Sequence, residues 1–394
     1  TAWQPDSSPM FMWHARSGDW HFGLHTNSFF GYDGASSRGD DELVSINWLM
    51  AMATHPAGSG DIAVRAMMSA EPATMPKNGY PLLLQTGETY LGDPLYDRQH
   101  PHDLFMELAF RYRQPIGSTP VGFELYLAPV GEPAIGPPAF PHRFTSMGDP
   151  LAPLGHHWFD STHITFGVLT VGLFTKRFKV EGSYFNGREP DEVRWNFDYR
   201  VPDSYSARLS VNPTRDISAQ ASWAHLDSPE WDEVDVSIDR TTVSATWNQV
   251  LVDQTSDFAV TAALGQNNPS MGASTYASLV ESTLMLKDTQ TVFARAEALT
   301  KRGHELALPA AMAGDTFGIG AFSAGYIYDF KPISSLATGV GVVGTVDFVG
   351  SALGAVYDTR TPFGGMVFVR LRPSMMRMSG SPATMSTMPM HHSM

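Results

Sequence analysis

The chain has 394 residues, of which 43% are apolar and 17% are charged, and its formal net charge is −14. This composition supports a folded protein, and without a basic face it argues against a nucleic-acid partner. The absence of cysteine excludes disulfides, thiolate metal sites and cysteine nucleophiles. No apolar run approaches the roughly 18 to 20 residues of a membrane helix, whereas each strand of a membrane barrel needs only about 10 alternating residues.

The N-terminal residues contain no charged-then-apolar leader and begin at Thr1. This beginning is typical of a mature chain without its signal peptide, and a chain truncated for another reason would look the same. We expect residues 1–18 to form an N-terminal periplasmic segment. A loose group of metal-ligating residues lies in and just after it, namely Met10, Met12, His14, His21 and His25.

Residues 19–373 contain many segments in which apolar and polar side chains alternate. In "YSARLSVN", Tyr205 and Leu209 lie on one face, and Arg208 and Asn212 lie on the other. A two-residue period is typical of strands with one apolar face. Sixteen strands are expected, near residues 19–32, 43–53, 61–70, 103–114, 121–129, 163–175, 178–186, 203–212, 217–226, 239–251, 257–266, 274–286, 291–300, 316–330, 335–348 and 364–372.

The connections between these segments alternate between long and short. Short turns at one end and long loops at the other are the arrangement of a bacterial outer-membrane barrel. The sequence therefore predicts an all-β fold, a transmembrane antiparallel β-barrel of about 16 strands over residues 19–373, in contact with outer-membrane lipid. An even strand number would place both termini on the periplasmic side. The two longest loops, Glu71 to His102 and Val130 to Thr162, are expected to enter the lumen and partly plug it.

Six of the fourteen histidines lie in or beside those two loops, accompanied by carboxylates. Imidazole is a preferred ligand of copper, zinc and nickel, and a nearby carboxylate can orient the ring. The candidate metal ligands are His100, His102, Asp103, His142, His156, His157 and His163. A purely structural interpretation stays open, because buried loops also need internal hydrogen-bond partners.

The segment 374–394 is rich in Met, His, Ser, Pro and Thr and has no strand or helix pattern. We expect a flexible tail, in which methionines have no core to fill. Thioethers select Cu(I) and imidazoles bind copper in both oxidation states, so copper is the expected ion. The candidate ligands are Met375, Met376, Met378, Met385, Met388, Met390, His391, His392 and Met394. A tolerated extension without function is the alternative.

Five motifs carry a resemblance to a known family: "DRQHPHDLFMEL", "GEPAIGPPAFPHR", "LGHHWFDSTHITFG", "FNGREPDE" and "RLSVNPT". From about Trp20 to Pro373 the chain resembles a bacterial family of outer-membrane barrels, mostly uncharacterised, whose genes often lie near copper-resistance genes. The resemblance implies a barrel and a link to copper, and it implies no reaction and no site. One departure is that the last predicted strand, "GGMVFVRLRP", is followed by the Met/His tail instead of ending on an aromatic residue.

Three functions follow from these features. The leading prediction is a porin-like outer-membrane barrel that binds or passes metal ions, copper above all, with a periplasmic copper protein or another barrel as a candidate partner. A structural or partner-binding barrel is the first alternative, supported by the aromatic-rich loop "EVRWNFDY". The second is a surface hydrolase built on Asp160, Ser161 and His163, although three such close residues rarely converge.

Overall fold

A computed structural model of the chain describes residues 1–231 and 233–375. The alternating segments form the predicted strands, and each of the sixteen lies within a few residues of its expected position. The barrel strands are β2 (Trp20–Ala35), β3 (Asp41–Ala57), β4 (Gly60–Met68), β7 (Phe105–Pro115), β8 (Gly122–Gly131), β9 (Thr165–Phe174), β10 (Phe178–Phe185), β11 (Ser204–Thr214), β12 (Ile217–Leu226), β13 (Ile238–Val250), β14 (Asp257–Pro269), β15 (Thr275–Leu286), β16 (Gln290–Arg302), β17 (Thr316–Asp329), β18 (Leu336–Val349) and β19 (Phe363–Pro373).

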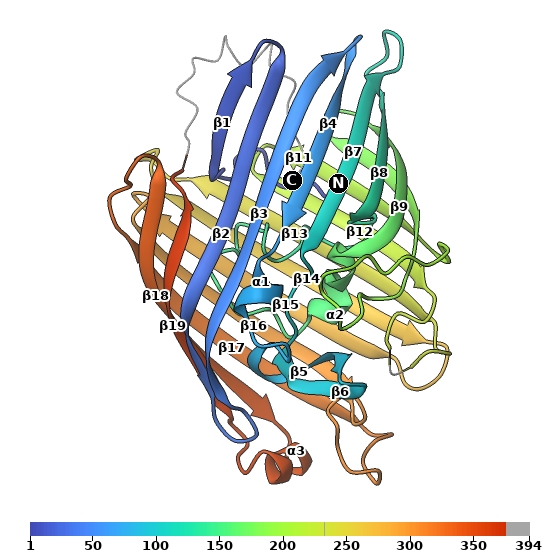
Figure 1. Cartoon of the computed structure of the whole chain (residues 1–394), viewed down its shortest axis with the longest axis vertical. Coiled ribbons are helices and arrows are strands. Elements are labelled where there is room, and N and C mark those ends of the chain that lie inside the picture. Colours follow the sequence, from blue (N-terminus) through green and yellow to red (C-terminus); the bar gives the residue numbers. More distant parts are fainter. Residues whose placement is uncertain (232, 376–394) are drawn as a thin grey trace.

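These sixteen strands, taken over the described part of the chain, form one closed antiparallel barrel (Figure 1). Each strand pairs with its neighbour in sequence, and β19 pairs with β2 from Gly364↔Ala35 to Leu371↔Ser28. A closed barrel has no free sheet edge, so every strand has two partners for its backbone groups. Where β19 ends, the short strand β1 (Met12–Ser17) continues beside β2, from Met12↔His25 to Ser17↔Trp20.

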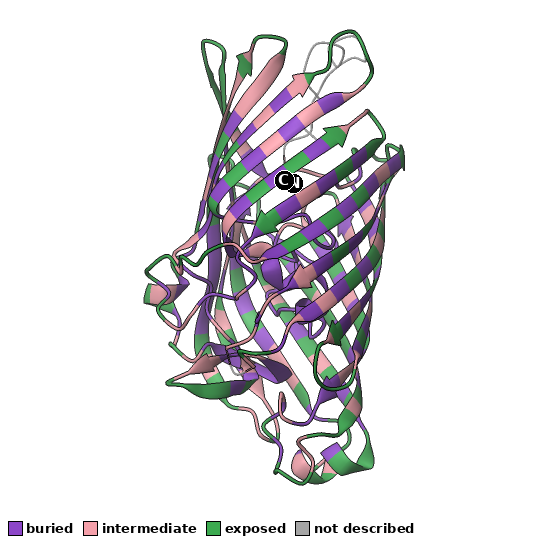
Figure 2. Ribbon diagram, turned by 90° about the vertical axis from the view of Figure 1, so that its right-hand side faces the viewer, coloured by how far each residue is buried: buried purple, intermediate pink, exposed green. Residues whose placement is uncertain are grey.

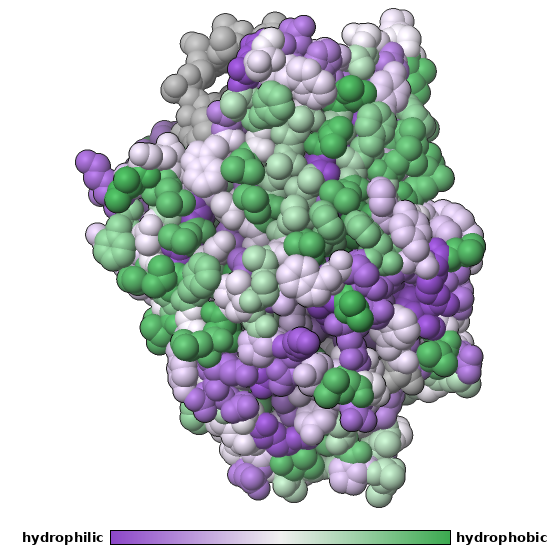
Figure 3. Space-filling model, in the orientation of Figure 1, coloured by the Kyte–Doolittle hydropathy of each residue, from purple (hydrophilic) through white to green (hydrophobic). Residues whose placement is uncertain are grey.

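Buried and exposed residues alternate along the strands (Figure 2), and the two faces of the sheet are opposite in character to those of a water-soluble barrel. In β11, Tyr205 and Leu209 point outward and are exposed, whereas Arg208 and Ser210 point into the lumen and are buried. The same inversion holds in β19, where Val367 is exposed and Arg370 is buried. Figure 3 shows hydrophobic side chains gathered over the upper part of one face and hydrophilic ones lower down. An apolar exterior of this kind suits contact with lipid.

Short turns and long loops are sorted to opposite ends of the barrel, as the sequence predicts. One end, here called the short-turn end, carries turns such as 58–59, 175–177 and 215–216. The other end, here called the mouth, carries the long connections 69–104, 132–164, 186–203, 227–237, 303–315 and 350–362. The loops at 36–40 and 270–274 are short for this end, because the adjoining strands extend further than expected.

The mouth connections contain structure that periodicity did not reveal. They include the hairpin β5 (Tyr80–Tyr90) and β6 (Asp93–Gln99), the helices α1 (Glu71–Thr74), α2 (His156–Phe159) and α3 (Ser351–Val356), and the 3-10 turn η1 (Ser161–His163). No helix among the described residues is both long and apolar enough to span a bilayer.

The loop 132–164 crosses the lumen and, together with residues 71–102, is here called the plug. Arg143 of the plug forms ion pairs with Glu281 of β15 and with Asp160. The backbone N–H groups of Leu154 and Gly155 donate to the carboxylate of Glu297 on β16. On another part of the wall, the N–H of Ala134 donates to the hydroxyl of Ser183 on β10 at 2.8 Å. The plug is therefore bonded to separate parts of the barrel wall, and the predicted filling of the lumen is confirmed.

The first eleven residues also lie inside the barrel. Thr1, Ala2 and Trp3 are buried, and the Thr1 hydroxyl donates to Glu181 of β10 at 2.7 Å. The Ser7 N–H donates to the carbonyl of Arg215, in the turn between β11 and β12. Sequence reasoning assigned residues 1–18 to a periplasmic segment. The structure places residues 1–11 in the lumen near the short-turn end and adds residues 12–17 to the sheet as β1.

Candidate functional site

Four of the predicted histidines line one cavity at the mouth. His100 and His102 follow β6, His156 lies in α2 and His163 lies in η1. They surround an empty volume of about 280 Å³ together with Glu88, Asp103, Glu189 and Arg194. The two long loops therefore bring together residues that are about 60 positions apart in the sequence.

In all four rings Nδ1 lies close to an oxygen, and in His100 the Nε2 atom is also paired, with Glu88. The Nδ1 atom of His102 lies 3.0 Å from Glu71 Oε2, and that of His156 lies 2.8 Å from Asp160 Oδ1. The Nδ1 atom of His163 lies 2.8 Å from the backbone oxygen of Asp160. When Nδ1 donates to an oxygen, the neutral ring presents Nε2 as the ligand atom, which is the usual orientation of metal-binding histidines. We call His102, His156 and His163 the mouth cluster.

The mouth cluster is compact and chemically suited to ligand binding. The ring centroid of His163 lies 5.5 Å from that of His102 and 5.2 Å from that of His156. Within the described residues, Nε2 of His163 is buried and has no hydrogen-bond partner. Burial lowers the pKa of His163 to about 3. Burial also lowers the pKa of His156, against the opposing effect of Asp160. These two rings are therefore neutral at physiological pH, as metal ligation requires.

His157 lies beside His156, with ring centroids 5.4 Å apart, and meets two carboxylates from other loops. Its Nδ1 lies 3.4 Å from Glu189 and 3.6 Å from Glu230. Over residues 1–231 and 233–375, this is the group of three histidine or carboxylate ligands whose ligand atoms all lie within 4.8 Å of one another. Burial acts to lower the pKa of His157, but Glu189 and Glu230 outweigh it and raise that pKa to about 10.

The remaining predicted ligands are distributed differently. His100 Nε2 lies 3.1 Å from Glu88. Burial raises the pKa of Asp103 well above its usual range. His142 belongs to the plug but not to the mouth cluster, because its Nε2 contacts the sulfur of Met67 on β4. Met375 packs beside an apolar cluster that contains Phe11. The other tail candidates, from Met376 to Met394, lie outside the described residues.

Sequence reasoning found Glu71 and Asp160 as accompanying carboxylates but missed Glu189 and Glu230. Both lie on other mouth loops, Glu189 within the motif "FNGREPDE". The proximity of those loops to α2 depends on barrel closure. The signal in the sequence that could have revealed Glu189 and Glu230 is the acidic character of these loops at the predicted mouth.

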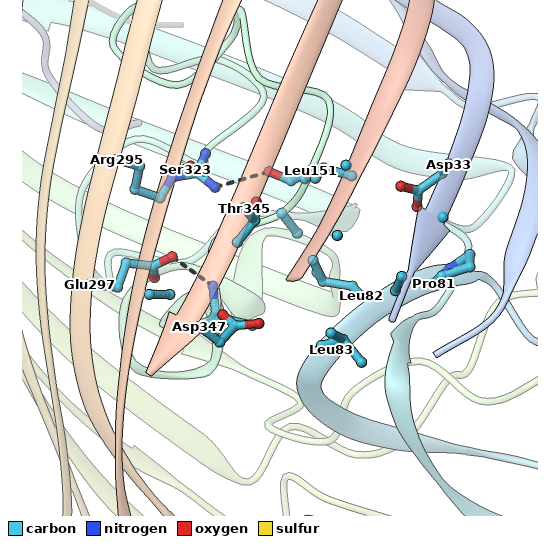
Figure 4. A pocket seen from close by; sticks show the side chains of 17 residues that line it. Asp33, Pro81, Leu82, Leu83, Leu151, Arg295, Glu297, Ser323, Thr345 and Asp347 are labelled. Atoms are coloured by element: carbon cyan, nitrogen blue, oxygen red, sulfur yellow. Dashed lines mark hydrogen bonds between the residues drawn. The ribbon is translucent and has the colours of Figure 1, made fainter. Parts of the chain in front are cut away.

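A second cavity lies between the plug and the barrel wall, with an empty volume of about 470 Å³ (Figure 4). Asp33, Glu297 and Asp347 line it from β2, β16 and β18. Glu297 is satisfied by plug N–H groups, whereas among the described residues one oxygen each of Asp33 and Asp347 has no hydrogen-bond partner. Arg295 of β16 lines the cavity as well, so the lining contains a basic group beside the three carboxyl groups.

The residues of the hydrolase alternative have other partners. The carboxylate of Asp160 pairs with His156 and Arg143, and the Ser161 hydroxyl accepts a hydrogen bond from Arg240 at 3.0 Å. His163 contacts the backbone oxygen of Asp160, not its carboxylate. The geometry therefore gives no support to a Ser/His/Asp triad at this position.

Comparison with known proteins shows the fold. No protein-family model matches the chain, and no curated protein matches its sequence. OmpF of Salmonella typhi, solved in complex with daunomycin, is similar with a TM-score of 0.53 and 9% identity, over 91% of this chain and 100% of that one. A loop L8 deletion mutant of OmpT of Vibrio cholerae is similar with a TM-score of 0.52 and 8% identity, over 90% of this chain and 99% of that one. An anion-selective porin from Comamonas acidovorans is similar with a TM-score of 0.51 and 9% identity, over 89% of this chain and 99% of that one. The chain therefore has the porin-like barrel fold of outer-membrane proteins.

Proposed function

We propose that this chain is a bacterial outer-membrane barrel that binds or passes metal ions, copper first among them, at its plugged mouth. The porin-like fold and the apolar exterior support a membrane location and the passage of solutes. The observation that carries the metal proposal is the His157, Glu189 and Glu230 group, whose ligand atoms lie within 4.8 Å of one another. Beside it, the mouth cluster offers imidazole nitrogens, which suit copper, zinc and nickel.

The carboxylates around both cavities add to this proposal. Glu189 lines the cavity of the mouth cluster, whereas His157 and Glu230 line an adjacent empty volume of about 610 Å³. An ion held by this group would therefore lie between two spaces within the mouth.

The test is titration of the detergent-purified protein with Cu(II) and Zn(II), with binding measured by calorimetry and by elemental analysis. The variant His157→Gln combined with Glu189→Gln should weaken binding at least about tenfold, since two of three ligands are lost. His225→Gln is the matched control, because His225 also pairs with a carboxylate, Asp239, at 2.8 Å on β12 and β13. Equal affinity in wild type and the double variant would rule out this mouth site.

The tail is the second metal-binding element of the proposal. We expect that removal of residues 374–394, with its seven methionines and His391-His392, lowers the number of Cu(I) ions bound per chain and leaves Zn(II) binding at the mouth unchanged. Softness of the thioether is the reason for this difference. Metal analysis of the full and shortened chains checks it, and equal Cu(I) stoichiometry in both would exclude the tail.

One observation favours a second function, the docking of a partner protein. The mouth loop after β10 exposes Val193, Trp195, Tyr199 and Val201, the last of them 83% exposed. Large apolar side chains clustered on a surface mark contact sites. Because the chain has no cysteine, Tyr199→Cys would provide a unique cross-linking position. Cross-linked products in native membranes would support docking, and a monomeric product alone would count against it.

A further inference from the structure

A row of methionine and histidine side chains crosses four neighbouring strands on their inward face. Met12 of β1 pairs with His25 of β2, His25 with Met50 of β3, and Met50 with Met67 of β4. Cross-strand partners have Cβ atoms about 4.5–5.5 Å apart, so neighbouring side chains in such a row touch or nearly touch. All four are at most 4% exposed. We call them the soft-ligand row.

The plug adds a fifth residue over this row. The Nε2 atom of His142 lies 3.2 Å from the sulfur of Met67, and its ring centroid lies 6.0 Å from that of His25. The indole of Trp48 packs against both rings, with centroids 4.6 Å from each. Two imidazoles, one indole and the thioether of Met67 therefore meet between the plug and the wall, and Met12 and Met50 are the register partners of His25 on either side.

The histidines, not the methionines, require an explanation. Methionine is an ordinary filler of irregular interiors, so buried Met50 or Met67 alone would indicate packing. His25 is 1% exposed, and within the described residues neither of its ring nitrogens has a hydrogen-bond partner. Nδ1 of His142 is likewise buried and unpartnered there. Burying polar atoms without partners costs free energy, and a ligand for those nitrogens would offset that cost.

The donor set defines the ligand. Thioethers select soft Cu(I), and neutral imidazoles bind it as well. Metal–imidazole bonds are about 2 Å long, so two rings with centroids 6.0 Å apart can share one ion between them. The indole of Trp48 can further stabilise a desolvated cation through its π face. A hard divalent ion would find no carboxylate in this set.

We propose that Met12, His25, Met50, Met67 and His142 form an internal site for one soft monovalent metal ion, Cu(I) or Ag(I). The proposal deepens the proposed function, and rests on it in that the barrel is taken to handle copper. Two further histidines share the inward face toward the short-turn end. His14 pairs with Gly23, and His21 is two residues beyond it on β2. They form a path of ligands from that end to the soft-ligand row.

The experiment uses the full chain in detergent, titrated anaerobically with Cu(I) against a chromophoric chelator and, separately, with Ag(I). The test variant is Met50→Leu with Met67→Leu, because leucine conserves volume and apolar character. The control is Met366→Leu, another inward-facing methionine that is 1% exposed, on β19. A further variant, Trp48→Phe, tests whether a change in tryptophan fluorescence on metal binding comes from Trp48. Circular dichroism and the heat-dependent mobility of the barrel verify folding for every variant.

If the site exists, the double variant should bind Cu(I) at least about tenfold more weakly than wild type, whereas Met366→Leu should bind normally. Ag(I) should change the tryptophan fluorescence of wild type but not of Trp48→Phe. Equal Cu(I) affinity in the double variant and the control would overturn the internal site. If Cu(II) binds at the mouth while no Cu(I) binds at the row, the inference fails and the proposed function survives. Absence of binding for all these ions would overturn both.

Discussion

Protonation of single histidines controls what the mouth can bind. The mouth cluster holds His156 and His163 neutral, because burial lowers the pKa of both. One residue along the chain, His157 has a pKa of about 10, because two carboxylates outweigh the same burial. Adjacent rings thus have opposite charge states at neutral pH. A neutral ring such as that of His156 can bind a metal ion directly, whereas the protonated ring of His157 must first release a proton.

This difference predicts a pH dependence. Metal affinity at His157 should rise about tenfold per pH unit between roughly pH 6 and 8, with about one proton released per ion. His157→Gln should remove both effects, and His225→Gln should keep them. The stability of the ion-free protein changes with pH in the opposite direction. The protonated His157 ring stabilises the fold fully below the ordinary histidine pKa of about 6.5. This stabilisation is lost as the pH rises through the pKa of about 10 in the folded protein.

Calorimetry in buffers of different ionisation enthalpy measures the released protons. Urea unfolding of the ion-free protein as a function of pH measures the stability change. If affinity does not vary with pH while His157 still contributes to binding, the ring is neutral in the free protein and the role assigned to Glu189 and Glu230 is wrong.

At the scale of elements, the barrel strands and their antiparallel order were predictable, whereas the contacts among the mouth loops were not. A two-residue period is a local property, so Tyr205, Leu209 and Arg208 revealed β11 and its two faces directly. The hairpin of β5 and β6 was missed because its backbone is irregular, with positive φ at Leu84, Glu88, Leu91 and Asp97. In the site, spacing predicted His102, His156 and His163, but Glu230 joins His157 only through barrel closure.

The outward face of a strand should tolerate charge poorly. Leu209 lies on the apolar exterior of β11 and is 47% exposed. Leu209→Arg should destabilise the barrel in lipid by about 2–4 kcal/mol, because a guanidinium near the bilayer midplane loses its hydration. Urea unfolding in liposomes measures this. Val252→Arg is the control, since Val252 is 97% exposed in the turn between β13 and β14. Equal effects of both variants would show that β11 does not face lipid.

For the whole molecule, the plug occupies the lumen through which solutes would pass. Sixteen strands enclose a lumen wide enough for water, but here residues 132–164 cross it. Replacing residues 134–160 by a short Gly/Ser linker should raise single-channel conductance in planar bilayers several-fold over that of wild type. Shortening the loop 303–315, another connection at the mouth, serves as the control. A folded plug variant with wild-type conductance would show that other segments close the lumen.

The seam between β2 and β19 has a consequence for how the molecule is assembled. It joins strands from opposite ends of the described sequence, so its loop-closure entropy is the largest in the barrel. Thr1 to Phe11 lie inside the ring that this seam completes, and so does the plug. We therefore expect the pairing of β2 with β19 to be the last and slowest event of folding. Segments that have not entered the lumen by then would have to thread through a closed cylinder.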